Sequence, residues 1–321
     1  MQAGTWTLRN PDFPASAIFN SFPITYDVVR ERVIAVLRGK TYEWDGATWT
    51  EVASFGPQPR ERSGVLVFRN SARAAYLFGG RIAEPVKSVG DPWEWNGSGW
   101  TKLPEFGPKE RHHHAMTYDI ARDRVILFGG QLEDEVLGDT WEWDGLGWTP
   151  FAAGPRSRIW HAMAYDSKRK KTVLFGGYDK TDAGDGADLA DTWEWDGAVW
   201  SQLSDTGPSS RRRHAMVFDE VRSRVLLYGG QRDAKTKVAG VDTEFISQVE
   251  LGDTWEWDGR HWTQLSNSGP GQQVDHGMAY DQKRKCVVLL TAGGNDTWEW
   301  VSKPGNAVEM FIAEVAPASP T

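Results

Sequence analysis

The chain repeats one stretch, Asp139-Thr140-Trp141-Glu142-Trp143-Asp144-Gly145, six times with small changes. The other five copies have their last tryptophan at Trp44, Trp95, Trp195, Trp257 and Trp300. Successive copies are 51, 48, 52, 62 and 43 residues apart. A period of about 50 residues indicates a chain built from repeated structural units, on which the rest of the sequence can be aligned.

Each repeat contains four short segments with the pattern of β-strands. In the third repeat the first segment spans 114–119 and ends in Tyr-Asp, and the second is an apolar run that ends in two glycines. The third is Trp-Glu-Trp, whose alternation sends both indoles to one face of a sheet and the carboxylate to the other. Asp144-Gly145 supplies a hairpin turn, because glycine accepts a positive φ, and the fourth segment begins at Trp148.

Six such units predict an all-β fold, a six-bladed β-propeller of four-stranded antiparallel blades, since no helical period separates the segments. The sixth repeat stops after Val301 without a fourth segment, while an unmatched strand-like segment stands at 5–8. We therefore expect the N-terminal strand to close the last blade and cover its open edge. The predicted organisation is one propeller domain over 1–301 and a C-terminal tail over 302–321.

The paired glycines, the later tryptophan and the Tyr-Asp pair recur in nearly every copy. Together with the long period they resemble the kelch repeat, over essentially the whole chain, and imply a kelch-type propeller similar to that of galactose oxidase. The WD40 propeller is the alternative, because Trp-Asp also recurs, as at Trp143-Asp144. The copper chemistry of galactose oxidase is not expected, since the only cysteine, Cys286, lies in an apolar strand segment.

The amino-acid composition limits the classes of partner that we expect. The 321 residues carry 36 Lys+Arg against 44 Asp+Glu, a net charge of −8, which disfavours nucleic acid as a partner. One cysteine excludes an intramolecular disulfide and CxxC metal or redox motifs. No signal peptide and no 18-residue apolar run are visible, so we expect a cytoplasmic protein with no membrane partner.

Residues that recur in every blade are expected to serve the fold. The repeat accounts for 17 of the 18 tryptophans, and Trp160 alone lies outside it. Six of the seven histidines cluster where the first strands begin, at His112, His113, His114, His161, His214 and His276. A metal-binding ring of imidazoles is conceivable, but sixfold spacing around a channel holds the nitrogens apart, so no metal and no cofactor are expected.

The residues just before the repeated histidine differ from blade to blade and are the candidate site. The predicted ligand-binding residues are Arg111, His112, His113, Arg158, Trp160, Arg212, Arg213 and Asp275. Arginine can hold an anion with two hydrogen bonds, and an indole can stack on a ring. Arg111 and Arg158 recur three residues before the histidine, which equally suits a structural network between blades. The alternative for the whole set is ordinary solvated loop residues.

Two functions from different classes follow from this site. The first is a propeller that binds a small anionic molecule or an acidic peptide at the mouth of the channel. The second is a cofactor-independent enzyme of the isomerase, mutarotase or cyclase type, in which Asp275 or His113 moves a proton. Kelch-type sialate mutarotases offer a precedent in kind, although no motif matches. A third reading, assembly through the side of the propeller, requires an exposed apolar patch.

Overall fold

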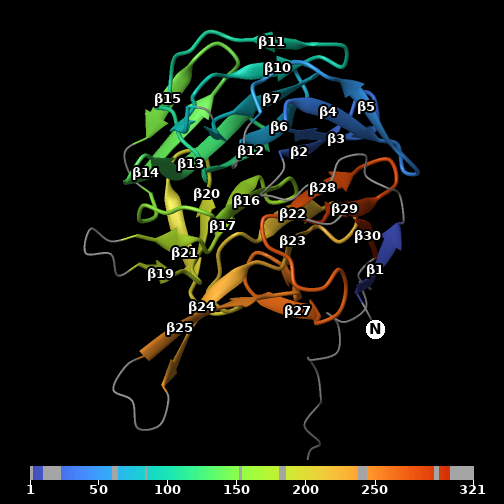
Figure 1. The fold of residues 1–321 in the computed structure, drawn as a ribbon. Helices are drawn as coiled ribbons and strands as arrows, with labels where there is room; N and C mark the ends of the chain where they lie inside the picture. The colour runs from blue at the N-terminus through green and yellow to red at the C-terminus, as the bar shows by residue number, and fades with distance from the viewer. Residues whose placement is uncertain are drawn as a thin grey trace, which may run out of the picture.

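The computed structural model describes residues 3–9, 23–59, 64–83, 85–151, 154–180, 186–237, 244–292 and 296–303. In these ranges the chain forms strands, turns and bends, and no helix. Six four-stranded antiparallel sheets stand around a central channel, and the colours of Figure 1 follow the chain from blade to blade around the ring. The predicted all-β, six-bladed propeller is therefore confirmed.

In each blade the first strand of the repeat lies innermost. The strands of blades one and two, from the channel outward, are β2 (Ile24–Asp27), β3 (Arg32–Leu37), β4 (Lys40–Trp44), β5 (Trp49–Ala53) and β6 (Val65–Arg69), β7 (Ala74–Phe78), β10 (Trp93–Trp95), β11 (Trp100–Lys102). Those of blades three and four are β12 (Ala115–Asp119), β13 (Arg124–Leu132), β14 (Glu135–Trp143), β15 (Trp148–Phe151) and β16 (Ala162–Asp166), β17 (Lys171–Phe175), β20 (Thr192–Trp195), β21 (Trp200–Ser204). Those of blades five and six are β22 (Ala215–Asp219), β23 (Arg224–Tyr228), β26 (Thr254–Trp257), β27 (Trp262–Ser266) and β28 (Gly277–Asp281), β29 (Cys286–Leu290), β30 (Thr297–Ser302), β1 (Gly4–Arg9).

Three further hairpins extend from the loops after the paired glycines. They are β8–β9 (Arg81–Ile82 and Lys87–Ser88), β18–β19 (Tyr178–Asp179 and Ala187–Asp188) and β24–β25 (Gln231–Lys237 and Glu244–Glu250). The β24–β25 ribbon projects from blade five, as Figure 1 shows at the lower left. No helix in the described part of the chain is long and apolar enough to cross a membrane.

The N-terminal strand and the last strand of the propeller close the ring of blades. Strand β1 pairs antiparallel with β30, with Trp6 opposite Trp300, so the predicted closure of the last blade is confirmed. The Trp6 ring lies 5.1 Å from that of Tyr228, and its Nε1 donates a hydrogen bond to the Thr254 hydroxyl at 3.0 Å. Since Tyr228 and Thr254 belong to blade five, one N-terminal side chain joins blades five and six.

The tryptophan that follows Trp-Glu-Trp by five residues bonds four blades to the preceding blade, and Trp6 does the same for blade six. The Nε1 of the repeated tryptophan donates at 2.7–2.9 Å to the hydroxyl of the threonine that begins the third strand segment of the preceding blade, in the pairs Trp49–Thr297, Trp100–Thr41, Trp200–Thr140 and Trp262–Thr192. Blade two has Pro92 at the threonine position and offers no hydroxyl there. The repeated tryptophans are thus part of the blade contacts, as expected.

The glutamate of Trp-Glu-Trp is also structural. In blade three the Arg122 guanidinium donates to both Asp119 and Glu142 at 2.6 Å. Arg169 bonds Asp166 and Glu194 in the same way in blade four. The carboxylates are buried while the Arg122 and Arg169 side chains are 32% and 26% exposed, so breaking either pair costs less than breaking a fully buried pair, for which about 3–5 kcal/mol is expected.

Candidate functional site

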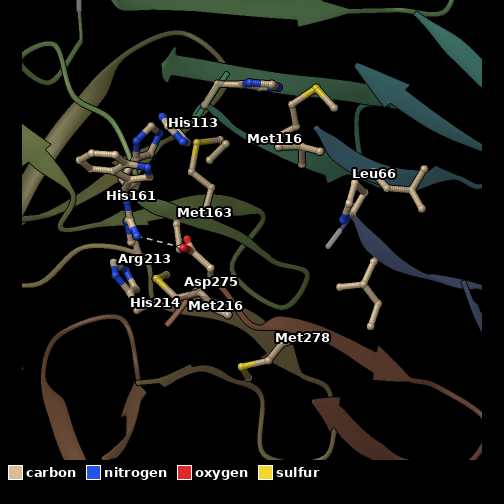
Figure 2. Close-up of a pocket in the computed structure, with 18 of the residues that line it drawn as sticks. Leu66, His113, Met116, His161, Met163, Arg213, His214, Met216, Asp275 and Met278 are labelled. Carbon is tan, nitrogen blue, oxygen red and sulfur yellow. Dashed lines mark hydrogen bonds and ion pairs between the residues drawn. The ribbon is translucent and has the colours of Figure 1, made fainter. Parts of the chain in front are cut away.

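A cavity of about 200 Å³ opens at the mouth of the channel where the inner strands begin (Figure 2). Blades three to six each contribute to its wall the residue that precedes the repeated histidine. These residues are His113, Trp160, Arg213 and Asp275. The structure therefore brings four of the eight predicted site residues into one cavity.

The backbone explains why these four residues share one level of the channel. All four have left-handed backbone conformations, with φ between 56° and 59°. The N–H of Trp160 donates to the His113 carbonyl at 3.1 Å, that of Arg213 to Trp160 at 2.9 Å, and that of Asp275 to Arg213 at 3.1 Å. Non-glycine residues rarely adopt this conformation, but eight other described residues of this chain share it, so it defines the geometry of the turn and does not by itself mark a functional site. We call this hydrogen-bonded set of four residues the mouth belt.

The side chains of the mouth belt interact with one another. Arg213 donates one hydrogen bond to Asp275 at 3.1 Å, and the two side chains are 26% and 13% exposed. The Arg213 guanidinium also lies 4.6 Å from the Trp160 ring centroid, a favourable cation–π distance. The His113 ring is 4.8 Å from the Trp160 ring. Arg213 is thus held by a ring on one side and a carboxylate on the other.

The repeated histidines have a different role. Their rings pack edge-on against an aromatic ring of the preceding blade, in the pairs His114–Phe78, His161–Phe128, His214–Phe175 and His276–Tyr228. Burial lowers the pKa of His161 and His276 to about 3 and that of His214 well below its usual value. In the part of the chain that the structure describes, no group of three or more His, Cys, Asp or Glu side chains could hold a metal ion.

Arg111 and Arg158 do not line the cavity. Both side chains are buried, and each grips one carboxylate with two hydrogen bonds, Asp139 at 2.6 and 2.9 Å and Asp191 at 2.7 and 2.8 Å. Each also donates to the carbonyl of the first paired glycine of its blade. Burial alone would raise the pKa of Asp191, but the hydrogen bonds and positive charge of Arg158, together with a hydrogen bond from Trp193, outweigh it and lower the pKa. This geometry suits the structural network, the other role considered for these arginines.

Arg212 and His112 also lie outside the cavity lining. The Arg212 guanidinium is buried between two loop carboxylates, Asp188 at 2.5 Å and Asp233 at 2.8 Å. Burial alone would lower the pKa of Arg212, but these carboxylates outweigh it and raise the pKa. His112 Nδ1 lies 3.0 Å from the Ser88 hydroxyl. Both predicted ligand residues are engaged with the hairpins above the blades.

The floor of the cavity is a feature that sequence reasoning missed. The inner strands of the six blades place one apolar side chain each at the same level, the set Ile24, Leu66, Met116, Met163, Met216 and Met278, which we call the apolar ring. All but Leu66 also line a second cavity of about 240 Å³ further along the inner strands. The signal was present, because Ala-Met or Gly-Met follows the repeated histidine in four blades.

Comparison with known proteins gives the fold and no more. No protein-family model matches the chain, and no curated protein does. A solved structure described as "Structure of YjhT" is similar at a TM-score of 0.71 with 15% sequence identity, and the match covers 92% of this chain and 97% of that one. The fold is a six-bladed β-propeller. That the repeats belong to the kelch family stays a prediction.

Proposed function

We propose that the protein is a ligand-binding propeller that takes a small anionic molecule, or one acidic side chain of a peptide, at the mouth belt. Arg213 carries this proposal. Of the four arginines predicted to bind an anion, it alone lines the cavity, and it gives Asp275 one hydrogen bond where Arg111 and Arg158 each grip a carboxylate with two. A guanidinium has five N–H donors, so most of them remain for a ligand.

Two buried donors support an oxygen-rich ligand group. Nε of Arg213 and Nε1 of Trp160 are among the buried side-chain nitrogens of the described residues that have no hydrogen-bond partner. A buried donor without an acceptor costs about 1–3 kcal/mol, so an oxygen-rich ligand group that reaches either nitrogen recovers part of this free energy. Both residues line the cavity at the mouth belt.

A cofactor-independent isomerase, mutarotase or cyclase is the second candidate. It is favoured by the carboxylate of Asp275 and the imidazole of His113 in one cavity wall. A carboxylate held beside a guanidinium can accept a proton from a bound substrate and return it at another position. Turnover of a bound ligand would distinguish this candidate from simple binding.

A thermal-shift and calorimetry screen of small carboxylates tests the proposal. We expect a subset to raise the melting temperature of the native protein and to lose that effect in Arg213→Gln. Arg156→Gln is the matched control, because the Arg156 side chain is 65% exposed and lies outside the cavity lining. Carboxylate stabilisation that survives unchanged in Arg213→Gln would refute the anion site.

A further inference from the structure

The charged side chains of the cavity wall indicate which kind of anionic ligand the site binds. Among the described lining residues, the formally charged side chains are Arg213 and Asp275, one of each sign, joined at 3.1 Å (Figure 2). An anion that approaches Arg213 therefore also meets the Asp275 carboxylate, and the like charges repel. A ligand with a positive group beside its negative group avoids this repulsion.

Building on the proposed function, we propose that the ligand is a small zwitterion with an apolar side chain, of the α-amino acid type. Its carboxylate binds the Arg213 guanidinium, and its ammonium group binds the Asp275 carboxylate. The two ligand charges then replace the internal ion pair with two charge-assisted hydrogen-bond partners. Each protein charge keeps an opposite charge in the free and in the bound state.

Trp160 keeps the Arg213 side chain in place when the ligand charges replace the Arg213–Asp275 ion pair. The Arg213 guanidinium lies 4.6 Å from the Trp160 ring centroid, and this contact does not involve Asp275. The backbone N–H of Asp275 donates to the Arg213 carbonyl at 3.1 Å, so both residues stay in register when their side chains separate. The site is therefore ordered before the ligand binds, which reduces the entropy lost on binding.

The part of the cavity below the mouth belt determines which side chains of the ligand fit. The next wall positions inward, after the repeated histidines, are the small residues Ala115, Ala162 and Ala215, and then comes the apolar ring. In blades three to six the apolar ring is the second residue of the inner strand, about 3.3 Å along the strand from the small residue that follows the repeated histidine. Methionines adapt to the shape of an apolar group, so the cavity favours aliphatic side chains of several shapes. Among the described residues that line this level of the cavity, none carries a charge that could pair with a charged side chain.

Calorimetric titration with L-leucine and its single-charge analogues tests the inference. The native protein should bind leucine at least tenfold more tightly than 4-methylpentanoate, which lacks the ammonium group, or 3-methylbutylamine, which lacks the carboxylate. L-Glutamate and glucose should bind at least tenfold more weakly than leucine. Glucose binding as tightly as leucine would overturn the inference in favour of a neutral polyol.

Two variants separate this inference from the proposed function. Asp275→Asn should weaken leucine binding at least tenfold and leave 4-methylpentanoate binding equal or tighter, whereas Arg213→Gln should abolish both. The zwitterion inference would be overturned if leucine and 4-methylpentanoate bound equally tightly and Asp275→Asn changed both affinities by the same factor. The anion site would then remain intact. Failure of every carboxylate to bind would overturn both. Melting curves without ligand verify that each variant is folded.

Discussion

The buried histidines predict a steep loss of stability in mild acid. His161, His214 and His276 are buried against aromatic rings, and burial lowers their pKa far below the ordinary 6.5, to about 3 for His161 and His276. In the unfolded chain they bind protons below pH 6.5, while in the folded protein they stay neutral. Stability is therefore full above pH 6.5 and is lost as the pH falls from there towards 3.

The size of the effect follows from proton linkage. Near pH 5.5 an unfolded histidine is about nine-tenths protonated, so each buried histidine lowers the free energy of unfolding by about 1.2 kcal/mol per pH unit. Three of them give about 3.7 kcal/mol per unit. The carboxylates in the arginine clamps, such as Asp191, have lowered pKa values and lose their contribution only at more acidic pH. Burial raises the pKa of Asp219 and Glu220, and these two groups act in the opposite direction, so a histidine variant is needed to isolate the histidine share.

Guanidinium unfolding curves at several pH values measure this slope. We expect His276→Gln to reduce the slope by about 1.2 kcal/mol per unit near pH 5.5, whatever it costs in absolute stability. His276 is a suitable choice because it lies outside the lining of the mouth cavity. His261→Gln is the control, since the exposed side chain of His261 is solvated in both states. Equal slopes for the native protein and His276→Gln would refute the linkage argument.

Three further substitutions test the architecture. Trp6→Ala removes the ring packed on Tyr228 and the hydrogen bond to Thr254, so it should cost about 3 kcal/mol, and an unchanged melting temperature would contradict the closure by β1. Gly177→Ala should destabilise by about 1–3 kcal/mol, because φ is 102° and the new Cβ would lie 2.8 Å from the Ile159 carbonyl, whereas Gly147→Ala meets nothing within 4 Å and should be neutral in the same unfolding assay. Asp191→Asn should cost about 3–5 kcal/mol by chemical denaturation, since it leaves Arg158 buried without a carboxylate, and a loss below 1 kcal/mol would contradict the clamp.

The fold could be predicted because its causes are local and repeated. Trp-Glu-Trp alternation, the Asp-Gly turns and the paired glycines each specify a strand or its end, and six copies leave one arrangement. The closure by β1 was also readable, since the sixth repeat lacked a fourth strand and the N-terminus supplied an unmatched one. Of the predicted tail over 302–321, the structure describes only Ser302 and Lys303. The separation of the tail from the propeller therefore stays a prediction.

The site could be predicted only in part, because side-chain partners from distant loops decide it. Arg212 and Arg213 are adjacent in sequence, yet Arg212 is neutralised by Asp188 and Asp233, which lie 24 and 21 residues away. Nothing in the local pattern distinguishes the two arginines. Composition likewise could not show that Arg213 rests on Trp160 from the neighbouring blade. The choice among the candidate arginines therefore depended on tertiary structure.

The mouth belt explains why one position varies where its neighbours repeat. The histidine that follows it packs between blades, so its identity is constrained by aromatic neighbours in four blades. The belt position itself supplies only a left-handed backbone and one N–H donor to the ring, and these demands are met equally by His113, Trp160, Arg213 and Asp275. Glycine would satisfy that backbone with less strain. Four larger side chains stand in its place, two of them oppositely charged and all lining one cavity, and this arrangement fits the ligand that we propose.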